Sequence, residues 1–187
     1  MDADFDTAVL GLGLPPEVES ALREAGAQRA DAPRAMAALM RAKALAPEHP
    51  AVLIAFYRHH FYGHRPALAR DVARRALVVG AQALGLPALW REVPHQPLPG
   101  ARHDVRTRFY LFVLKGLAYL SLRLGDEREA RDALVLLRAL DPQDCVGASV
   151  LEAVRQRALV PPDDDELPAP PATGAAAWAR LAPVRAG

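Results

Sequence analysis

The densest group of side chains that could perform chemistry is the run FYRHHFYGHR at residues 56–65. His60 and His64 stand four positions apart, a spacing that can place two imidazoles on one helical face and bind a metal ion. Gly63, however, is expected to end the helix before His64, and no carboxylate lies close by in the sequence. The pattern therefore favours a packing role for His60, and we expect neither a bound metal nor a cofactor.

Signatures of catalysis are missing elsewhere in the sequence. Gly11-Leu-Gly13 is followed by Leu-Pro-Pro and lacks the third glycine of a dinucleotide-binding loop. The serines at positions 20, 121 and 149 do not lie in a nucleophile elbow. Cys145 is the single cysteine and follows Asp144, whose carboxylate would oppose a thiolate. We therefore expect a protein that is not an enzyme.

The clearest structural pattern is the segment from Leu111 to Pro142, which predicts two amphipathic helices joined by Gly125-Asp126. Apolar and small side chains recur at helical spacing in both halves, which is typical of helices that bury one face. The residues on the first face are Leu114, Leu117, Ala118 and Ser121, and those on the second are Ala130, Leu134 and Leu137.

This pattern resembles the tetratricopeptide repeat, a helix-turn-helix unit of about 34 residues that buries its apolar face by stacking on neighbouring units. Residues 31–47 match the second helix of this pattern well, and residues 50–83 repeat both helices less regularly. The resemblance implies an all-α fold: a right-handed superhelical stack of about three units, closed by a C-terminal capping helix to about Leu159. Val146, Val150, Leu151 and Val154 are expected to form the apolar face of that helix.

The prolines that close the first and last units lie further apart than two repeats require, which indicates an insertion near 78–104. Part of the insertion is expected to extend the preceding helix, and Trp90 is expected to anchor the rest as an ordered loop. We therefore predict a flexible lead-in at 1–14, a helical domain at 15–159 and a mostly disordered tail at 160–187, rich in Pro and Ala.

In this repeat family the solvent-facing side of each first helix lines a groove. By matching position, that groove would be formed by Arg58, Phe61, Tyr62, Phe112, Lys115, Tyr119 and Arg123. Aromatic side chains mixed with cations are typical of protein interfaces. The partner is expected to be a protein or peptide with acidic and apolar groups. Arg70 and Arg74 share a second helical face, which we expect to be solvated.

Three further segments, FYRHHFYGHRPALARDVARRAL, LGLPALWREV and RFYLFVLKGLAYLSLRLGDEREA, resemble small tetratricopeptide-type proteins encoded in bacterial nitrogen-fixation gene clusters. The resemblance implies an adaptor or chaperone that serves nitrogenase assembly, protection or regulation. Two alternatives stay open: metal or cofactor handling through the histidines, and a structural homo-oligomer.

The overall composition limits the partners and the location. Lys and Arg number 23 against 22 Asp and Glu, a balance that gives no general attraction to nucleic acid or to an anionic membrane. The N-terminus lacks the features of a signal peptide, and the longest apolar run is too short to span a bilayer. We therefore expect a cytoplasmic bacterial protein.

Overall fold

The computed structural model describes residues 13–159, so most of the predicted lead-in and the whole predicted tail at 160–187 lie outside the described residues. Residues 13–155 belong to one compact unit. The described residues are all-helical, as predicted, with seven α-helices, one short 3-10 helix and no strand. In chain order these are α2 (Pro16–Ala27), α3 (Ala32–Leu45), α4 (Pro50–Tyr62), α5 (Pro66–Leu84), η1 (Trp90–Glu92), α6 (Val105–Arg123), α7 (Glu127–Leu140) and α8 (Ala148–Leu159).

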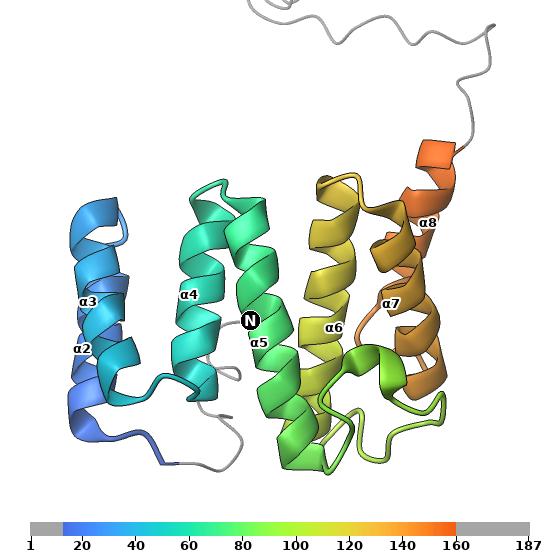
Figure 1. The fold of residues 1–187 in the computed structure, drawn as a ribbon, viewed down its shortest axis with the longest axis horizontal. Helices are drawn as coiled ribbons and strands as arrows, with labels where there is room; N and C mark the ends of the chain where they lie inside the picture. The colour runs from blue at the N-terminus through green and yellow to red at the C-terminus, as the bar shows by residue number, and fades with distance from the viewer. Residues whose placement is uncertain (1–12, 160–187) are drawn as a thin grey trace, which may run out of the picture. The chain divides into compact units, whose positions relative to one another are not determined.

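Successive helices pair as antiparallel hairpins: α2 with α3, α4 with α5, and α6 with α7 (Figure 1). The α4/α5 hairpin lies between the other two. Helix α5 packs on α6 as extensively as helices pack within a hairpin, whereas α3 meets α4 over a smaller contact. The two C-terminal hairpins therefore share one core, which positions α4, α5 and α6 against one another.

Side-chain caps define where the helices begin. Asp31 accepts a hydrogen bond from the Arg34 backbone N–H at 3.1 Å and so forms the N-cap of α3. Asp104 caps α6 and Asp126 caps α7 in the same way. Gly125 has a φ of 74°, a left-handed conformation that glycine adopts without steric cost, and it forms the tight turn between α6 and α7.

The core is built from the faces that the sequence pattern predicts. On α6 the buried residues include Leu114, Leu117, Ala118 and Ser121, and on α7 they include Ala130, Leu134 and Leu137. Leu53, Phe56 and His60 of α4 are also buried. Ala130 is 0% exposed, and its small side chain allows α7 to approach its neighbours closely.

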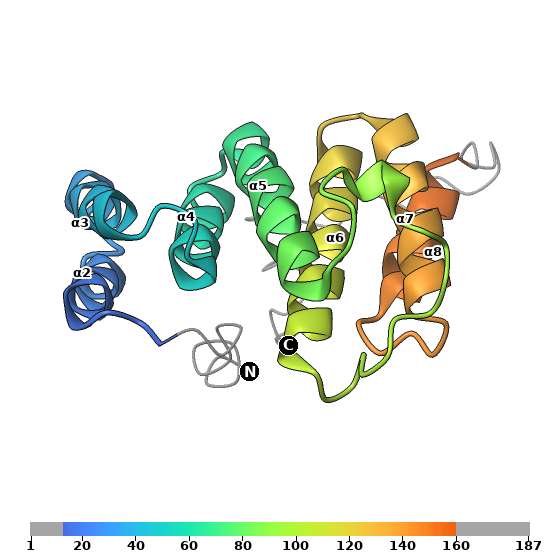
Figure 2. The same cartoon turned by 60° about the horizontal axis from the view of Figure 1, so that its bottom comes forward.

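The insertion extends α5 and then forms a loop. Helix α5 ends at Leu84, and Gly85 follows in a left-handed conformation. The loop then passes α7 before it reaches α6 (Figure 2), with Trp90 only 8% exposed in the C-terminal core. Farther along, the Leu98 N–H donates to the Leu140 carbonyl at 2.9 Å, which ties the loop to the end of α7.

The predicted apolar face of the capping helix is wrong in two positions. Val146 and Leu151 are buried, but Val150 is 63% exposed and Val154 is 53% exposed. No further helix among the described residues covers that side of α8, so these valines remain in contact with solvent. In the described part of the chain, no helix is both long enough and apolar enough to cross a bilayer.

Candidate functional site

A groove of about 250 Å³ opens between α4, α5 and α6. Its floor includes Ala73 and Ala76 of α5, whose small side chains leave room between the two flanking helices. Four of the residues predicted for the groove are among its lining residues. The full lining is Leu53, Ile54, Tyr57, Arg58, Phe61, Tyr62, Ala73, Ala76, Phe112 and Val113.

Aromatic rings form a continuous group along one end of the groove, and Phe61 stands at its centre. The Phe61 ring centroid lies 5.7 Å from that of Tyr57, 5.4 Å from that of Tyr62 and 5.7 Å from that of Tyr119. The Phe61–Tyr119 contact joins α4 to α6, so the structure brings Tyr119 beside the groove. Tyr62 is 74% exposed, which leaves a large aromatic surface open at the rim.

The hydroxyl of Tyr57 is held against α6. A Cβ at Gly116 would lie 3.0 Å from the Tyr57 hydroxyl oxygen, so the absence of a side chain at Gly116 permits this approach. Burial raises the pKa of Tyr57 to about 12, with smaller contributions from Tyr119 and Tyr62. The hydroxyl is therefore neutral at physiological pH and can donate a hydrogen bond in the groove.

Cations flank the aromatic rings. Arg58 lines the groove, Arg123 donates a hydrogen bond from Nη1 to the Tyr119 hydroxyl at 3.2 Å, and the Arg108 guanidinium lies 5.9 Å from the Phe112 ring centroid. Neither α4 nor α6 contains an Asp or Glu residue. The arrangement suits a ligand that carries carboxylates and apolar side chains together.

Lys115, which the repeat position predicts for the groove, is not among the residues that line it. Its ammonium group donates to the Val146 carbonyl at 2.6 Å and lies close to Gly147. The turn that precedes α8 therefore binds the Lys115 ammonium group, which a groove ligand would need. The Lys115 side chain thus contacts the turn before α8.

The histidine cluster is not arranged as a metal site. Helix α4 ends at Tyr62, and His64 adopts a φ of 55° beyond it, so His60 and His64 do not share a helical face. His59 Nε2 lies 2.7 Å from an Arg65 guanidinium nitrogen. Burial, together with Arg65 and His59, lowers the pKa of His60. Among residues 13–159 no group of three His, Cys, Asp or Glu side chains could hold a metal ion.

A buried carboxylate that the sequence analysis missed organises the second arginine face. Glu129 is only 3% exposed and accepts hydrogen bonds from the Ser121 hydroxyl at 2.8 Å, from Arg74 at 2.9 Å and from Arg70 at 3.3 Å. The prediction that Arg70 and Arg74 are solvated is therefore wrong for Arg70, whose side chain is 19% exposed. The sequence did contain a signal for this contact. Ser121 lies near the end of α6, and an acidic residue follows in the first turn of α7.

The same carboxylate secures the inserted loop. The Arg91 guanidinium lies 3.4 Å from Glu129 and 4.2 Å from the centroid of the Trp90 ring. A cation stacked on an indole is a favourable contact. Trp90 is thus buried in the C-terminal core, and the loop around it is joined to α7 by charge as well as by burial.

A second hollow, of about 480 Å³, lies between α2 and α3. It is more open than the groove, and an exposed ion pair between Arg41 and Glu24 stands at its edge. Its lining carries no aromatic side chain. The groove between α4, α5 and α6 is therefore the stronger candidate for a binding site.

These features define an all-helical protein built from hairpins, with an aromatic and cationic groove. No family model matches the chain, and no solved structure matches it. The chain is 37% identical over 150 residues to a protein of Azotobacter chroococcum mcd 1, described as an "uncharacterized 19.8 kDa protein in nifW 5'region". The alignment covers 79% of this chain and 84% of the relative. The chain belongs to the family of that protein, which supports the resemblance to proteins from nitrogen-fixation gene clusters.

Proposed function

We propose that this protein is a non-enzymatic adaptor or chaperone that binds a segment of another protein in the groove between α4, α5 and α6. The observation that carries the proposal is the aromatic group around Phe61, flanked by cations and open at Tyr62. Rigid aromatic side chains beside arginine dominate the binding energy of protein interfaces. The segment it binds carries acidic and apolar groups.

The proposal extends to the architecture and to the biological setting. Three helical hairpins, with a groove lined by the first helices α4 and α6 and by α5, support a right-handed tetratricopeptide-like stack. The relative in the nifW 5' region supports a role in nitrogen fixation. We infer that the partner is a protein of nitrogenase assembly, protection or regulation.

The test measures binding of the purified full-length protein to the products of neighbouring nitrogen-fixation genes, one at a time, by biolayer interferometry. Truncating an aromatic anchor at an interface hot spot costs about 2 kcal/mol. Tyr119→Ala should therefore weaken binding about 30-fold at every salt concentration. Arg58→Glu should weaken binding mainly at low salt, because salt screens partly exposed charges.

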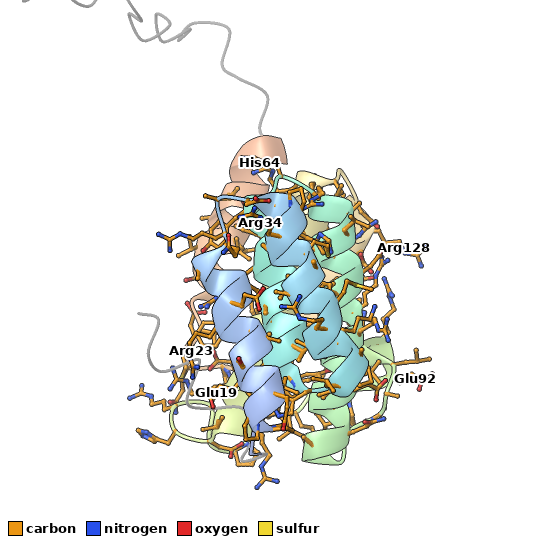
Figure 3. All side chains as sticks on the ribbon, turned by 90° about the vertical axis from the view of Figure 1, so that its left-hand side faces the viewer. Glu19, Arg23, Arg34, His64, Glu92 and Arg128 are labelled. Carbon is orange, nitrogen blue, oxygen red and sulfur yellow. The ribbon has the colours of Figure 1, made fainter. Side chains whose placement is uncertain are left out.

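The matched control for charge reversal is Arg128→Glu. Arg128 is exposed on α7 and projects from the surface (Figure 3), away from the groove lining. The Arg128→Glu variant should bind the partner as the wild type does. If Tyr119→Ala and Arg58→Glu also retain wild-type affinity for a partner that the wild type binds, recognition does not use the groove. Light scattering of the protein alone shows separately whether two copies of the chain associate.

A further inference from the structure

One hydroxyl group on the groove wall has no hydrogen-bond partner. Tyr57 lies on α4 and lines the groove, and its side chain reaches α6, where a Cβ on Gly116 would lie 3.0 Å from the hydroxyl oxygen. Within residues 13–159 this hydroxyl makes no hydrogen bond, whereas the Tyr119 hydroxyl accepts one from Arg123 at 3.2 Å. The Tyr57 side chain therefore brings an unpaired polar group to the wall of the groove.

A ligand that fills the groove must supply an acceptor for this hydroxyl. Burial raises the pKa of Tyr57 to about 12, so the proton stays on the oxygen at physiological pH. A ligand in the groove removes water from the hydroxyl, and a donor left without an acceptor weakens binding. Sites that pair with a ligand hydroxyl discriminate strongly against ligands that lack it. Tyr57 is therefore expected to determine which ligands the groove accepts.

The rest of the lining limits the ligand to a neutral group that carries a ring. The lining is apolar apart from Tyr57, Arg58 and Tyr62. A carboxylate would lose its hydration beside Leu53 and Val113, at a greater cost than a neutral hydroxyl. An indole offers a donor and no acceptor. A cavity of about 150 Å³ is enough for benzene, so the groove of about 250 Å³ has room for a substituted ring, whereas a Ser or Thr side chain would leave most of it empty.

We propose that the groove between α4, α5 and α6 binds the side chain of a tyrosine of the partner protein, whose phenolic oxygen accepts a hydrogen bond from the Tyr57 hydroxyl. The ring of that tyrosine lies among Ile54, Phe61 and Val113. Aromatic rings prefer offset or tilted contacts with one another, such as those of Phe61 with Tyr57 and Tyr119. The origin of the tyrosine rests on the proposed function, whereas binding of a phenol at this position does not.

Two amino-acid derivatives that differ by one hydroxyl test the site without any partner. N-acetyltyrosinamide and N-acetylphenylalaninamide are titrated separately into the full-length protein, and the methyl NMR signals of Ile54 and Val113 report binding in the groove. Val135 is 53% exposed on α7 and serves as the reference. One hydrogen bond favours binding by roughly threefold to tenfold, and we expect the tyrosine derivative to bind more tightly by that factor. Equal affinities, or no shift at Ile54 and Val113, would overturn the proposal.

Two variants assign the preference to the Tyr57 hydroxyl. Tyr57→Phe should bind both derivatives equally, and Gly116→Ala should lower the preference because the three atoms nearest to the new Cβ all belong to Tyr57. Both variants should fold, since Phe keeps the ring and Ala is a better helix former than Gly. In the Tyr57→Phe background, Gly116→Ala should change the preference no further. A preference that survives Tyr57→Phe would overturn the proposal.

Tyr110→Phe is the matched control for loss of a hydroxyl. Tyr110 is fully buried on α6, its hydroxyl makes no hydrogen bond to the described part of the chain, and it is not among the lining residues. This variant should prefer the tyrosine derivative as strongly as the wild type does. If Tyr110→Phe and Tyr57→Phe both abolish the preference, hydroxyl removal acts through the core, and the proposed contact is overturned.

Further probes distinguish other ligands for the groove. If N-acetyltryptophanamide binds as tightly as the tyrosine derivative, the requirement for an acceptor is overturned. If acetate shifts the Ile54 and Val113 signals and displaces N-acetyltyrosinamide, a carboxylate replaces the phenol as the ligand. If p-cresol binds and N-acetyltyrosinamide does not, the groove takes a free phenolic compound, and a protein side chain is overturned as its occupant.

The outcomes also separate this inference from the proposed function. Preference for the tyrosine derivative, without any neighbouring gene product that binds, supports the phenol site and counts against the adaptor role. A partner that is weakened by Tyr119→Ala but binds with equal affinity to the wild type and to Tyr57→Phe supports the adaptor role and overturns tyrosine recognition.

Discussion

Replacing Glu129 with Gln should destabilise the protein more than any neighbouring charge replacement on α7. Glu129 is 3% exposed and accepts bonds from one hydroxyl and three guanidinium groups. An amide can accept at one atom only, so part of this network loses its partner. Breaking a buried ion pair costs about 3–5 kcal/mol, and an unpaired buried hydroxyl about 1–3 kcal/mol.

Those two costs do not add in full at this site. The side chains of Arg74 and Arg91 are 41% and 54% exposed and can regain water, and Arg70 keeps Asp126 at 3.1 Å. We therefore expect a loss of about 3 kcal/mol in the free energy of unfolding. For a chain of this size that corresponds to a fall in Tm of roughly 6–12 °C.

Thermal unfolding followed by circular dichroism at pH 7 measures the loss. Glu127→Gln is the matched control, because Glu127 is exposed two positions earlier on α7 and its replacement should change stability by less than about 0.5 kcal/mol. A Glu129→Gln variant that melts within about 2 °C of wild type would refute the claim that this carboxylate holds α5, α7 and the inserted loop together.

Three further outcomes follow from the structure and the sequence. Ala130→Glu should cost several kcal/mol because Ala130 is 0% exposed, and a Tm close to wild type would contradict the packing of α6 on α7. The lowered pKa of His60 means that the unfolded chain binds a proton first, so stability is full above pH about 6.5 and falls as the pH drops below it; His60→Leu should flatten that decline in melts at pH 5 and 7. Deleting residues 161–187 should leave Tm nearly unchanged because their composition buries little apolar surface, and a large decrease would show that they contribute to the core.

The features that the sequence predicted are those set by local spacing. The buried positions of α6 and α7 recur at helical period, and a short acidic side chain before Pro33 marks the start of α3. Ala130 could be placed on the buried face of α7 because small and apolar side chains recur there at helical spacing. These signals can be recognised without knowing how the other helices pack, and the prediction of an all-α fold is based on them.

The features that the sequence did not predict depend on contacts between distant residues. Arg70 and Glu129 lie 59 positions apart, and only the packing of both α5 and α7 on α6 makes them partners. Lys115 occupies a groove position by register, yet its four-carbon side chain reaches Val146. Burial of Val150 would require a helix beyond α8, which the described residues do not contain.

The groove shows how these two kinds of information combine. Its rings and cations were predictable, because Arg58, Phe61 and Tyr119 follow from the solvent-facing register of two first helices. Its depth was not, because it depends on small residues from elsewhere: Ala73 on α5 at the floor, and Gly116, which admits the Tyr57 hydroxyl. The types of side chain on this surface thus follow from the local sequence, whereas the space into which a ligand fits depends on how three helices pack. A ligand for this groove must therefore be judged by shape as well as by charge.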